Sequence, residues 1–426
     1  MTTAPAGTDT GTGIRAGTGT SATRTPGAPA APGRPAARGP VPAFWLALLA
    51  TPIAAGANAP VLILPDMARS LGVSTSTASW LVSAFAWAMA VGTPLLAGLL
   101  RRTGLRPVLR LASVLVIAGT LLVAVSPWLP LTLAGRAAQA AGGAGLVAAA
   151  MSLAGTARRM GVISAGFGML GAAGPLLGEQ LAHAASWRLS LSVSVVAVLA
   201  VPAVLRYAGA ITPSSDRFDG RGAALLTVLA TALVTLPHAP LAALGAALAA
   251  AVLLALHIRR RPEGFVPATL LRKPVFLTSG LLALALSGSY FTLLFAVPRL
   301  LGDRAGWDTG SAAAGQLLAL LVGSALSWLL AAASARMGRP AVLAVLIGVG
   351  ALAAATAAFS DWGPLLLAAT VGGVFAATGA NACLSMHAAA GAPEHQRPTA
   401  IGLFALCYQL GGAFGPAVAA ALVLGS

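Results

Sequence analysis

Residues 129–153, LPLTLAGRAAQAAGGAGLVAAAMSL, contain one charged side chain, Arg136, in 25 positions. About 20 apolar residues are enough to cross a bilayer as a helix. Twelve more stretches of this kind occur along the chain, three before it and nine after it. We therefore predict an all-α polytopic membrane protein with thirteen spans: 43–64, 78–100, 107–127, 129–153, 161–183, 189–206, 222–237, 241–257, 274–298, 311–334, 340–358, 364–388 and 399–424.

The basic residues fall mainly on one side of these spans. Of the 26 Lys and Arg, 21 lie in the N-terminal tail and in alternate connections, four lie in the other connections, and Arg136 lies inside a span. Positive charge concentrates on the cytoplasmic side of membrane proteins. We therefore expect a cytoplasmic N-terminus. The net charge of +16 is then a sign of topology, and no nucleic-acid partner is expected.

Composition excludes an ordinary soluble domain, because 58% of the residues are hydrophobic and 8% are charged. Cys383 and Cys407 lie in apolar spans and form neither a disulfide framework nor a metal motif. No cofactor or enzymatic activity is expected. The excess of Arg over Lys, with much Ala and Gly, suggests a GC-rich bacterial genome and hence a bacterial inner membrane. Residues 1–42, rich in Thr, Gly and Pro, are predicted to be a disordered tail.

The spans carry an internal repeat. The run around Gly104 after the second span matches the run around Gly338 after the tenth, and Gly174-Pro175 in the fifth matches Gly415-Pro416 in the thirteenth. Parallel repeats are typical of transporters. The matching runs lie about 240 residues apart, which is more than six spans and their connections need. This separation implies that two further helices are inserted between the two halves. The predicted parts are a six-helix N-terminal half, the insertion, and a C-terminal half without an evident last helix: 43–206, 207–273 and 274–426.

The loop after the second span, Gly98-Leu-Leu-Arg101-Arg102-Thr-Gly104-Leu-Arg106, resembles the signature loop of the major facilitator superfamily, G-x-L-a-D-R-x-G-R-[RK]. Glycine permits the tight turn between the two helices. Arg101 stands where the family has an acidic residue, and Ala97 replaces its first Gly. The resemblance implies the major facilitator fold, with two halves around a midplane site and gating roles for this loop.

Arg136 and Gln139 in the fourth span look like the R-x-x-Q-G motif of the same family, with Ala140 in place of its Gly. A guanidinium at this depth costs about 2.5–3.5 kcal/mol on insertion scales. We therefore expect Arg136 to face a hydrated cavity or a partner. The alternative is an Arg that snorkels or pairs helices.

The fifth span contains Gly174, Pro175, Gly178 and Glu179, which resemble the antiporter element G-x-x-x-G-P-x-x-G-G with Glu179 in place of the last Gly. Small residues allow close helix packing, and proline leaves a carbonyl open. Glu179 is the one carboxylate well inside a span. It is predicted to carry protons and to pair with Arg136 in at least one state. The alternatives are a static ion pair or a carboxylate hydrated from outside.

Two sets of segments resemble the fourteen-helix drug/proton antiporters in particular. At the end of the first span these are Leu64-Pro65, residues 68–72 and Trp80, and beside the two inserted helices they are residues 217–221 and 259–276. The first-helix acid of that group would fall at Gly56, and Asn58 is the nearest polar residue. The resemblance implies efflux of small amphipathic or cationic organic compounds by proton antiport. The alternatives are an uncoupled or metabolite-specific transporter, or a degenerate membrane protein that does not transport.

Deep polar and aromatic residues are candidates for a substrate cavity, because ring faces attract organic cations. Such residues also commonly fill helix interfaces. The expected partners are a small-molecule substrate, protons and the lipid bilayer, with the chain a monomer. The candidate cavity residues are Phe85, Trp87, Gln139, Tyr290, Phe291, Asn381, Tyr408 and Gln409.

Overall fold

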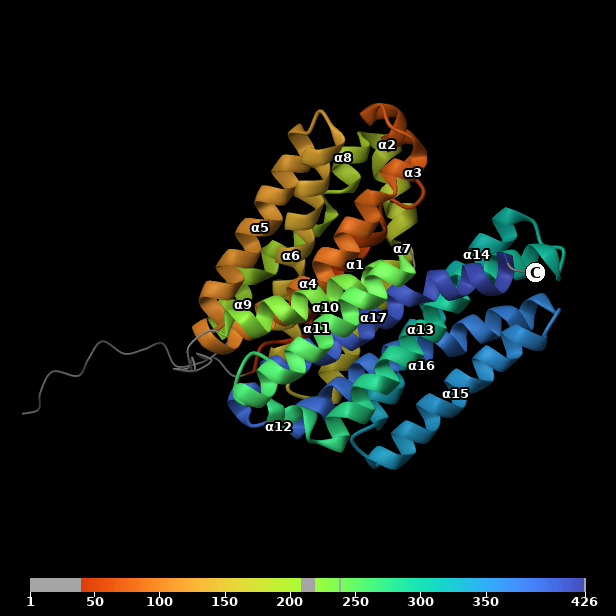
Figure 1. Ribbon diagram of the computed structural model, residues 1–426. Coiled ribbons are helices and arrows are strands. Elements are labelled where there is room, and N and C mark those ends of the chain that lie inside the picture. The colour runs from red at the N-terminus through yellow and green to blue at the C-terminus, as the bar shows by residue number, and fades with distance from the viewer. Residues whose placement is uncertain (1–39, 208–218, 237–238, 425–426) are drawn as a thin grey trace, which may run out of the picture. The chain divides into compact units, whose positions relative to one another are not determined.

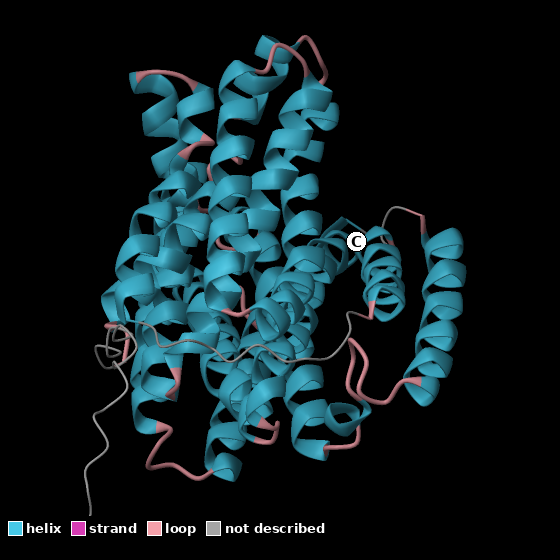
Figure 2. Cartoon of the chain, turned by 90° about the vertical axis from the view of Figure 1, so that its left-hand side faces the viewer, coloured by secondary structure: helices cyan, strands magenta, loops and turns pink. Residues whose placement is uncertain are grey.

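The computed structural model describes residues 40–207, 219–236 and 239–424, and most of them are helical. Short loops join the helices (Figure 2). Almost all of the predicted tail, residues 1–42, lies outside the described residues. So does 208–218, most of the connection that leads into the predicted insertion.

Ten helical segments of the described chain are long and apolar enough to cross a membrane, which confirms the predicted membrane class. They are α4 (Trp80–Thr103), α5 (Leu105–Val125), α6 (Leu129–Ala154), α7 (Ala157–Ala184), the segment Trp187–Tyr207, α11 (Pro240–Arg260), α13 (Pro274–Asp303), α14 (Thr309–Ala333), α15 (Arg339–Phe359) and α16 (Gly363–Ala390). The predicted number of thirteen spans stays a prediction.

The remaining helices are shorter or lie at the end of the chain. The segment Trp187–Tyr207 is itself built from α8 (Trp187–Ser190), the 3-10 helix η1 (Val193–Ala200) and α9 (Val201–Tyr207). The others are α1 (Ala43–Asn58), α2 (Leu64–Leu71), α3 (Thr75–Ala78), α10 (Gly220–Thr235), α12 (Ala268–Leu271), the 3-10 helix η2 (Glu394–Gln396) and α17 (Arg397–Leu424).

The first predicted span, 43–64, is too long. Helix α1 ends at Asn58, and the chain then turns before α2 begins at Leu64. Pro60 is the physical reason, because its ring replaces the N–H that a continuing helix would donate to the carbonyl of Gly56. Two turn hydrogen bonds follow, from the N–H of Val61 to Asn58 and from the N–H of Ile63 to Pro60.

Two pairs of helices, far apart in the chain, pack in the same manner. Helix α1 lies along α7, and α13 lies along α17. Both contacts are close because glycines face the neighbouring main chain. A side chain at Gly178 would lie 2.2 Å from the carbonyl oxygen of Ala59, and one at Gly411 would lie 2.2 Å from that of Leu284. The pairing agrees with the internal repeat.

Helices α10 and α11, the predicted insertion, lie side by side (Figure 1). Helix α10 also touches α4 and α17. Helix α11 exposes one leucine-rich face, including Leu244, Leu248 and Leu256, as expected of a helix that faces lipid.

Candidate functional site

Arg136 in α6 is the centre of a buried polar cluster. Its side chain has no exposed surface. Nη2 donates a hydrogen bond to the carbonyl oxygen of Gly56 in α1 at 3.1 Å, and Nη1 donates to Oε1 of Gln139 at 3.2 Å. The guanidinium carbon lies 4.2 Å above the ring centre of Phe85 in α4, a cation–π geometry. Pro60 makes the first bond available, because it leaves the Gly56 carbonyl without a helical donor.

Gln139 extends the cluster to two further elements. Its Nε2 donates to Oγ1 of Thr120 in α5 at 3.1 Å and to the carbonyl oxygen of Leu191 at 3.0 Å. Helix α5 comes this close because Gly119 and Gly135 face one another. A side chain at Gly119 would lie 2.6 Å from the Gly135 carbonyl oxygen. The cluster therefore fixes Arg136 among five helical segments, and sequence reasoning did not identify Thr120.

The glycine–proline element of α7, for which the sequence predicted close packing without naming a partner, packs against α1. Pro175 has no N–H, which leaves the carbonyl of Gly171 open, and Nδ2 of Asn58 donates to that oxygen at 2.8 Å. Gly174 brings the two helices together, since a side chain there would lie 2.8 Å from the carbonyl oxygen of Ala55. The predicted structural role of Gly174 and Pro175 thus has a direct physical basis.

Glu179 follows Gly178 near the end of α7 and is partly exposed. Within the described chain, no ion pair joins it to Arg136, whose partners are Gly56, Gln139 and the ring of Phe85. The predicted ion pair is absent from this conformation. The role of Glu179 in proton carriage stays a prediction.

The candidate cavity residues fall into separate groups. Phe85 and Gln139 belong to the Arg136 cluster, whereas Trp87 points to α10, where its Nε1 donates to Oγ1 of Thr231 at 3.0 Å. Tyr290 and Phe291 lie on α13 with ring centres 4.7 Å apart. Phe291 packs on Gly415 of α17, the helix that also carries Tyr408, Gln409 and Pro416.

Two polar contacts join helices that the repeat assigns to different halves. Nε2 of Gln409 in α17 donates to Oγ1 of Thr93 in α4 at 3.0 Å. Nδ2 of Asn381 in α16 donates to Oγ of Ser164 in α7 at 3.1 Å. Sequence reasoning identified Gln409 and Asn381 but missed both hydroxyl partners, because a lone Thr or Ser in an apolar helix is usually bonded to its own helix.

The basic loop predicted to act in gating joins α4 to α5. Gly104 has a φ of 80°, which confirms the need for glycine at this turn. Arg106 is exposed and Arg102 is half-buried. Gly98 lies against the ring of Phe265, which a side chain at position 98 would approach to 2.5 Å. We call this side of the molecule, with Arg101, Arg102 and the end of α11, the Arg-rich end.

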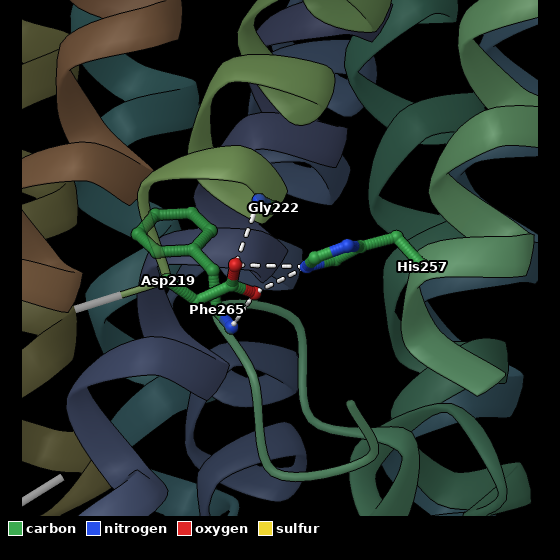
Figure 3. A network of polar contacts seen from close by, with 4 residues as sticks. All are labelled: Asp219, Gly222, His257 and Phe265. Atoms are coloured by element: carbon green, nitrogen blue, oxygen red, sulfur yellow. Dashed lines mark hydrogen bonds and ion pairs between the residues drawn. The ribbon is translucent and has the colours of Figure 1, made fainter. Parts of the chain in front are cut away.

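A second polar cluster lies at the Arg-rich end (Figure 3). Asp219 accepts hydrogen bonds from the N–H groups of Gly222 and Phe265, both at 3.0 Å, and both of its oxygens lie 2.8 Å from Nε2 of His257. Burial raises the pKa of Asp219, but these hydrogen bonds and the charge of His257 outweigh it and hold the pKa below its usual value. The cluster ties the start of α10 to the end of α11.

No group of three or more His, Cys, Asp or Glu side chains that could hold a metal ion occurs in the described part of the chain.

Of the predicted residues, Arg136, Gln139 and Phe85 form one site. Asn381 and Gln409 form contacts between helices, and Glu179 stands apart from both.

Comparison with known proteins agrees with this architecture. The model of the Major Facilitator Superfamily matches residues 44–416, so the chain belongs to that family, whose members are transporters and not enzymes. The chain resembles the crystal structure of the human organic anion transporter MFSD10, with a TM-score of 0.61 at 20% identity over 91% of this chain and 94% of that one. It also resembles a proton:xylose symporter, XylE, with a TM-score of 0.55 at 16% identity over 90% and 88%.

Curated relatives match over shorter regions. MFS transporter L2 of Phoma sp. is 31% identical over 150 residues, which cover 34% of this chain and 25% of the relative. An uncharacterized MFS-type transporter of Mycobacterium tuberculosis is 28% identical over 275 residues, which cover 58% of this chain and 39% of the relative. The chain thus spans well under two thirds of the length of these relatives.

Proposed function

We propose that the protein exports small amphipathic organic compounds across a bacterial inner membrane by alternating access, driven by proton antiport. One observation carries the proposal. Residues 316 and 217 positions apart in the chain are joined by the hydrogen bonds Gln409–Thr93 and Asn381–Ser164, which lie within the packed contacts of α17 with α4 and of α16 with α7. A bond between two uncharged side chains contributes about 0.5–1.5 kcal/mol, so these two bonds do not by themselves lock the helices together.

We further infer that the chain has thirteen spans and a cytoplasmic N-terminus. Its two halves rock about a central site. The similar packing of the α1–α7 and α13–α17 pairs supports two halves. The basic residues support the orientation. In this arrangement, the described conformation is closed at the Arg-rich end, where Gly402 of α17 approaches Ala97 of α4.

Glu179 is the proposed proton carrier. In the part of the chain that the structure describes, it is the one acidic residue inside a long helix away from its last turn. It directly follows Gly178, which packs at the end of α1. A carboxylate at this position can take up a proton from one side and release it when access changes.

The test is proton-gradient-driven transport in inverted vesicles, with a panel of lipophilic cations and antibiotics. Native transport that collapses in Glu179→Gln supports antiport through Glu179, and Arg136→Ala is expected to lower transport as well. Glu263→Gln, at an exposed loop position, is the matched control. Transport that survives Glu179→Gln rejects its role, and no transport by the native chain favours an unsampled metabolite or a protein that does not transport.

Uncoupled transport is the second candidate function, and one observation favours it. Gly56 stands where the related antiporters have an acid, and a side chain there would lie 2.0 Å from Oγ of Ser194. The site therefore has no room for that carboxylate unless Ser194 moves. Under uncoupled transport, a substrate gradient alone drives flux and an imposed pH gradient leaves the rate unchanged.

A further inference from the structure

The charges buried in this molecule are unbalanced. Arg136 is fully buried in α6, two turns after the helix begins at Leu129, and the other buried charged side chains of the described residues, Arg101 and Asp219, lie at helix ends. Among the acidic residues of the described ranges, only Glu179 lies inside a long helix before its last residue. It is partly exposed and makes no ion pair with Arg136.

The partners of Arg136 are dipoles and a ring, none of which carries a full negative charge. They are the Gly56 carbonyl at 3.1 Å, Gln139 Oε1 at 3.2 Å and the Phe85 ring at 4.2 Å. Its Nε finds no hydrogen-bond partner in the described residues. The three ion pairs of the described chain lie elsewhere, at Asp66, Asp219 and Asp361. The positive charge of Arg136 is therefore not neutralised locally.

We propose that the transported compound is an organic anion with an aromatic or other apolar body, selected over cations by the charge of Arg136. The proposal rests on the transport function proposed above and specifies its substrate. A charged substrate about 10 Å from the guanidinium, at an effective dielectric constant of about 20, has its dissociation constant changed by on the order of tenfold. The effect favours an anion and disfavours a cation, and it requires no direct contact with the guanidinium.

The other candidate cavity residues are compatible with this charge. Tyr290 and Tyr408 carry hydroxyl groups that can donate hydrogen bonds to a carboxylate or sulfonate. The amides of Gln409 and Asn381 can do the same once their bonds to Thr93 and Ser164 open. Glu179 makes no ion pair with Arg136 in the described chain, so it does not neutralise this charge by direct contact.

The experiment uses three probes on one scaffold: naphthalene sulfonate, naphthalene carboxamide and naphthyl-trimethylammonium. Uptake is measured with the purified full chain in phosphatidylcholine liposomes under an imposed pH gradient. We expect kcat/KM for the sulfonate to exceed that for the ammonium compound at least about tenfold. Arg136→Gln removes this preference and Arg136→Lys keeps it. Arg299→Gln, which removes the same charge at an exposed position of α13, leaves it unchanged.

The outcomes separate the two proposals. Native preference for the ammonium compound or the carboxamide overturns the assignment of an anion and leaves transport itself standing. A preference for the sulfonate that persists in folded Arg136→Gln overturns the role of Arg136. If Arg136→Gln does not fold, the native comparison and Arg136→Lys decide. Uptake of none of the three probes contradicts the transport function as well.

Discussion

At the scale of single residues, prolines and polar side chains act together in this molecule. Each proline in or just after a helix removes one N–H and opens the carbonyl four residues earlier. Three of these carbonyls accept a side-chain donor: Gly56 from Arg136, Gly171 from Asn58, and Leu294 from Gln316. The corresponding prolines are Pro60, Pro175 and Pro298. Proline thus creates a binding point for a polar group from a neighbouring helix.

This pairing predicts that Asn58 and Pro175 are energetically coupled. Asn58→Ala leaves the Gly171 carbonyl without a donor and is expected to cost about 0.5–1.5 kcal/mol. In a Pro175→Ala background the helix supplies its own N–H, so the same change costs less. A double-mutant cycle measures the coupling from thermal unfolding in detergent, followed with a thiol dye that reacts as Cys383 becomes exposed. Additive effects contradict the pairing.

At the scale of helices, Asp219 joins the two ends of the α10–α11 pair that meet at the Arg-rich end. One carboxylate joins the first turn of α10, the last turn of α11 and the loop at Phe265 (Figure 3). Phe265 in turn packs against Gly98 of α4. Asp219 is therefore one of several contacts that hold this region, beside the packing of Phe265 on Gly98 and the hydrogen bonds of Gln396 with Glu263 and Thr269.

Asp219→Asn is expected to lower the melting temperature at neutral pH, by the equivalent of about 1–3 kcal/mol, because a charged acceptor is lost. The folded-state pKa of Asp219 lies below its unfolded value of about 3.9. The contribution is thus present above about pH 4 and lost as the pH falls through the folded-state pKa. The difference between variant and native protein should shrink below pH 4. Asp361→Asn, at an exposed carboxylate, is the control, and a difference that does not change with pH contradicts the assignment.

At the scale of the whole molecule, alternating access requires the Thr93–Gln409 and Ser164–Asn381 contacts to separate. We expect a cross-link between Cys residues introduced at positions 93 and 409, in a Cys383→Ser/Cys407→Ser background, to stop transport. Single-Cys variants treated with the same reagent should remain active. The measurement compares uptake before and after cross-linking, and uptake that persists in fully cross-linked protein contradicts the proposed motion.

Much of this architecture could be predicted from hydropathy and glycine, because lipid imposes long apolar helices and glycines mark close packing. Arg136 and Gln139 were identifiable because polar side chains are costly inside a span, and Gly174 because it belongs to a repeated Gly-Pro motif. Thr120, Thr93 and Ser164 were not, since a hydroxyl in an apolar helix has no visible signal until its partner is known. The end of α1 was missed because apolar residues continue through Pro60.

Helix α1, with 16 residues, is about 24 Å long, whereas the hydrocarbon core of a bilayer is about 30 Å thick. If α1 begins at one surface of the membrane, the turn at residues 59–63 begins inside the hydrocarbon core, where lipid tails offer no hydrogen bonds to main-chain groups. Val61 and Leu62 are exposed there. Either water reaches this turn or the bilayer thins around it, so the local thickness of the membrane is partly set by where one proline ends one helix.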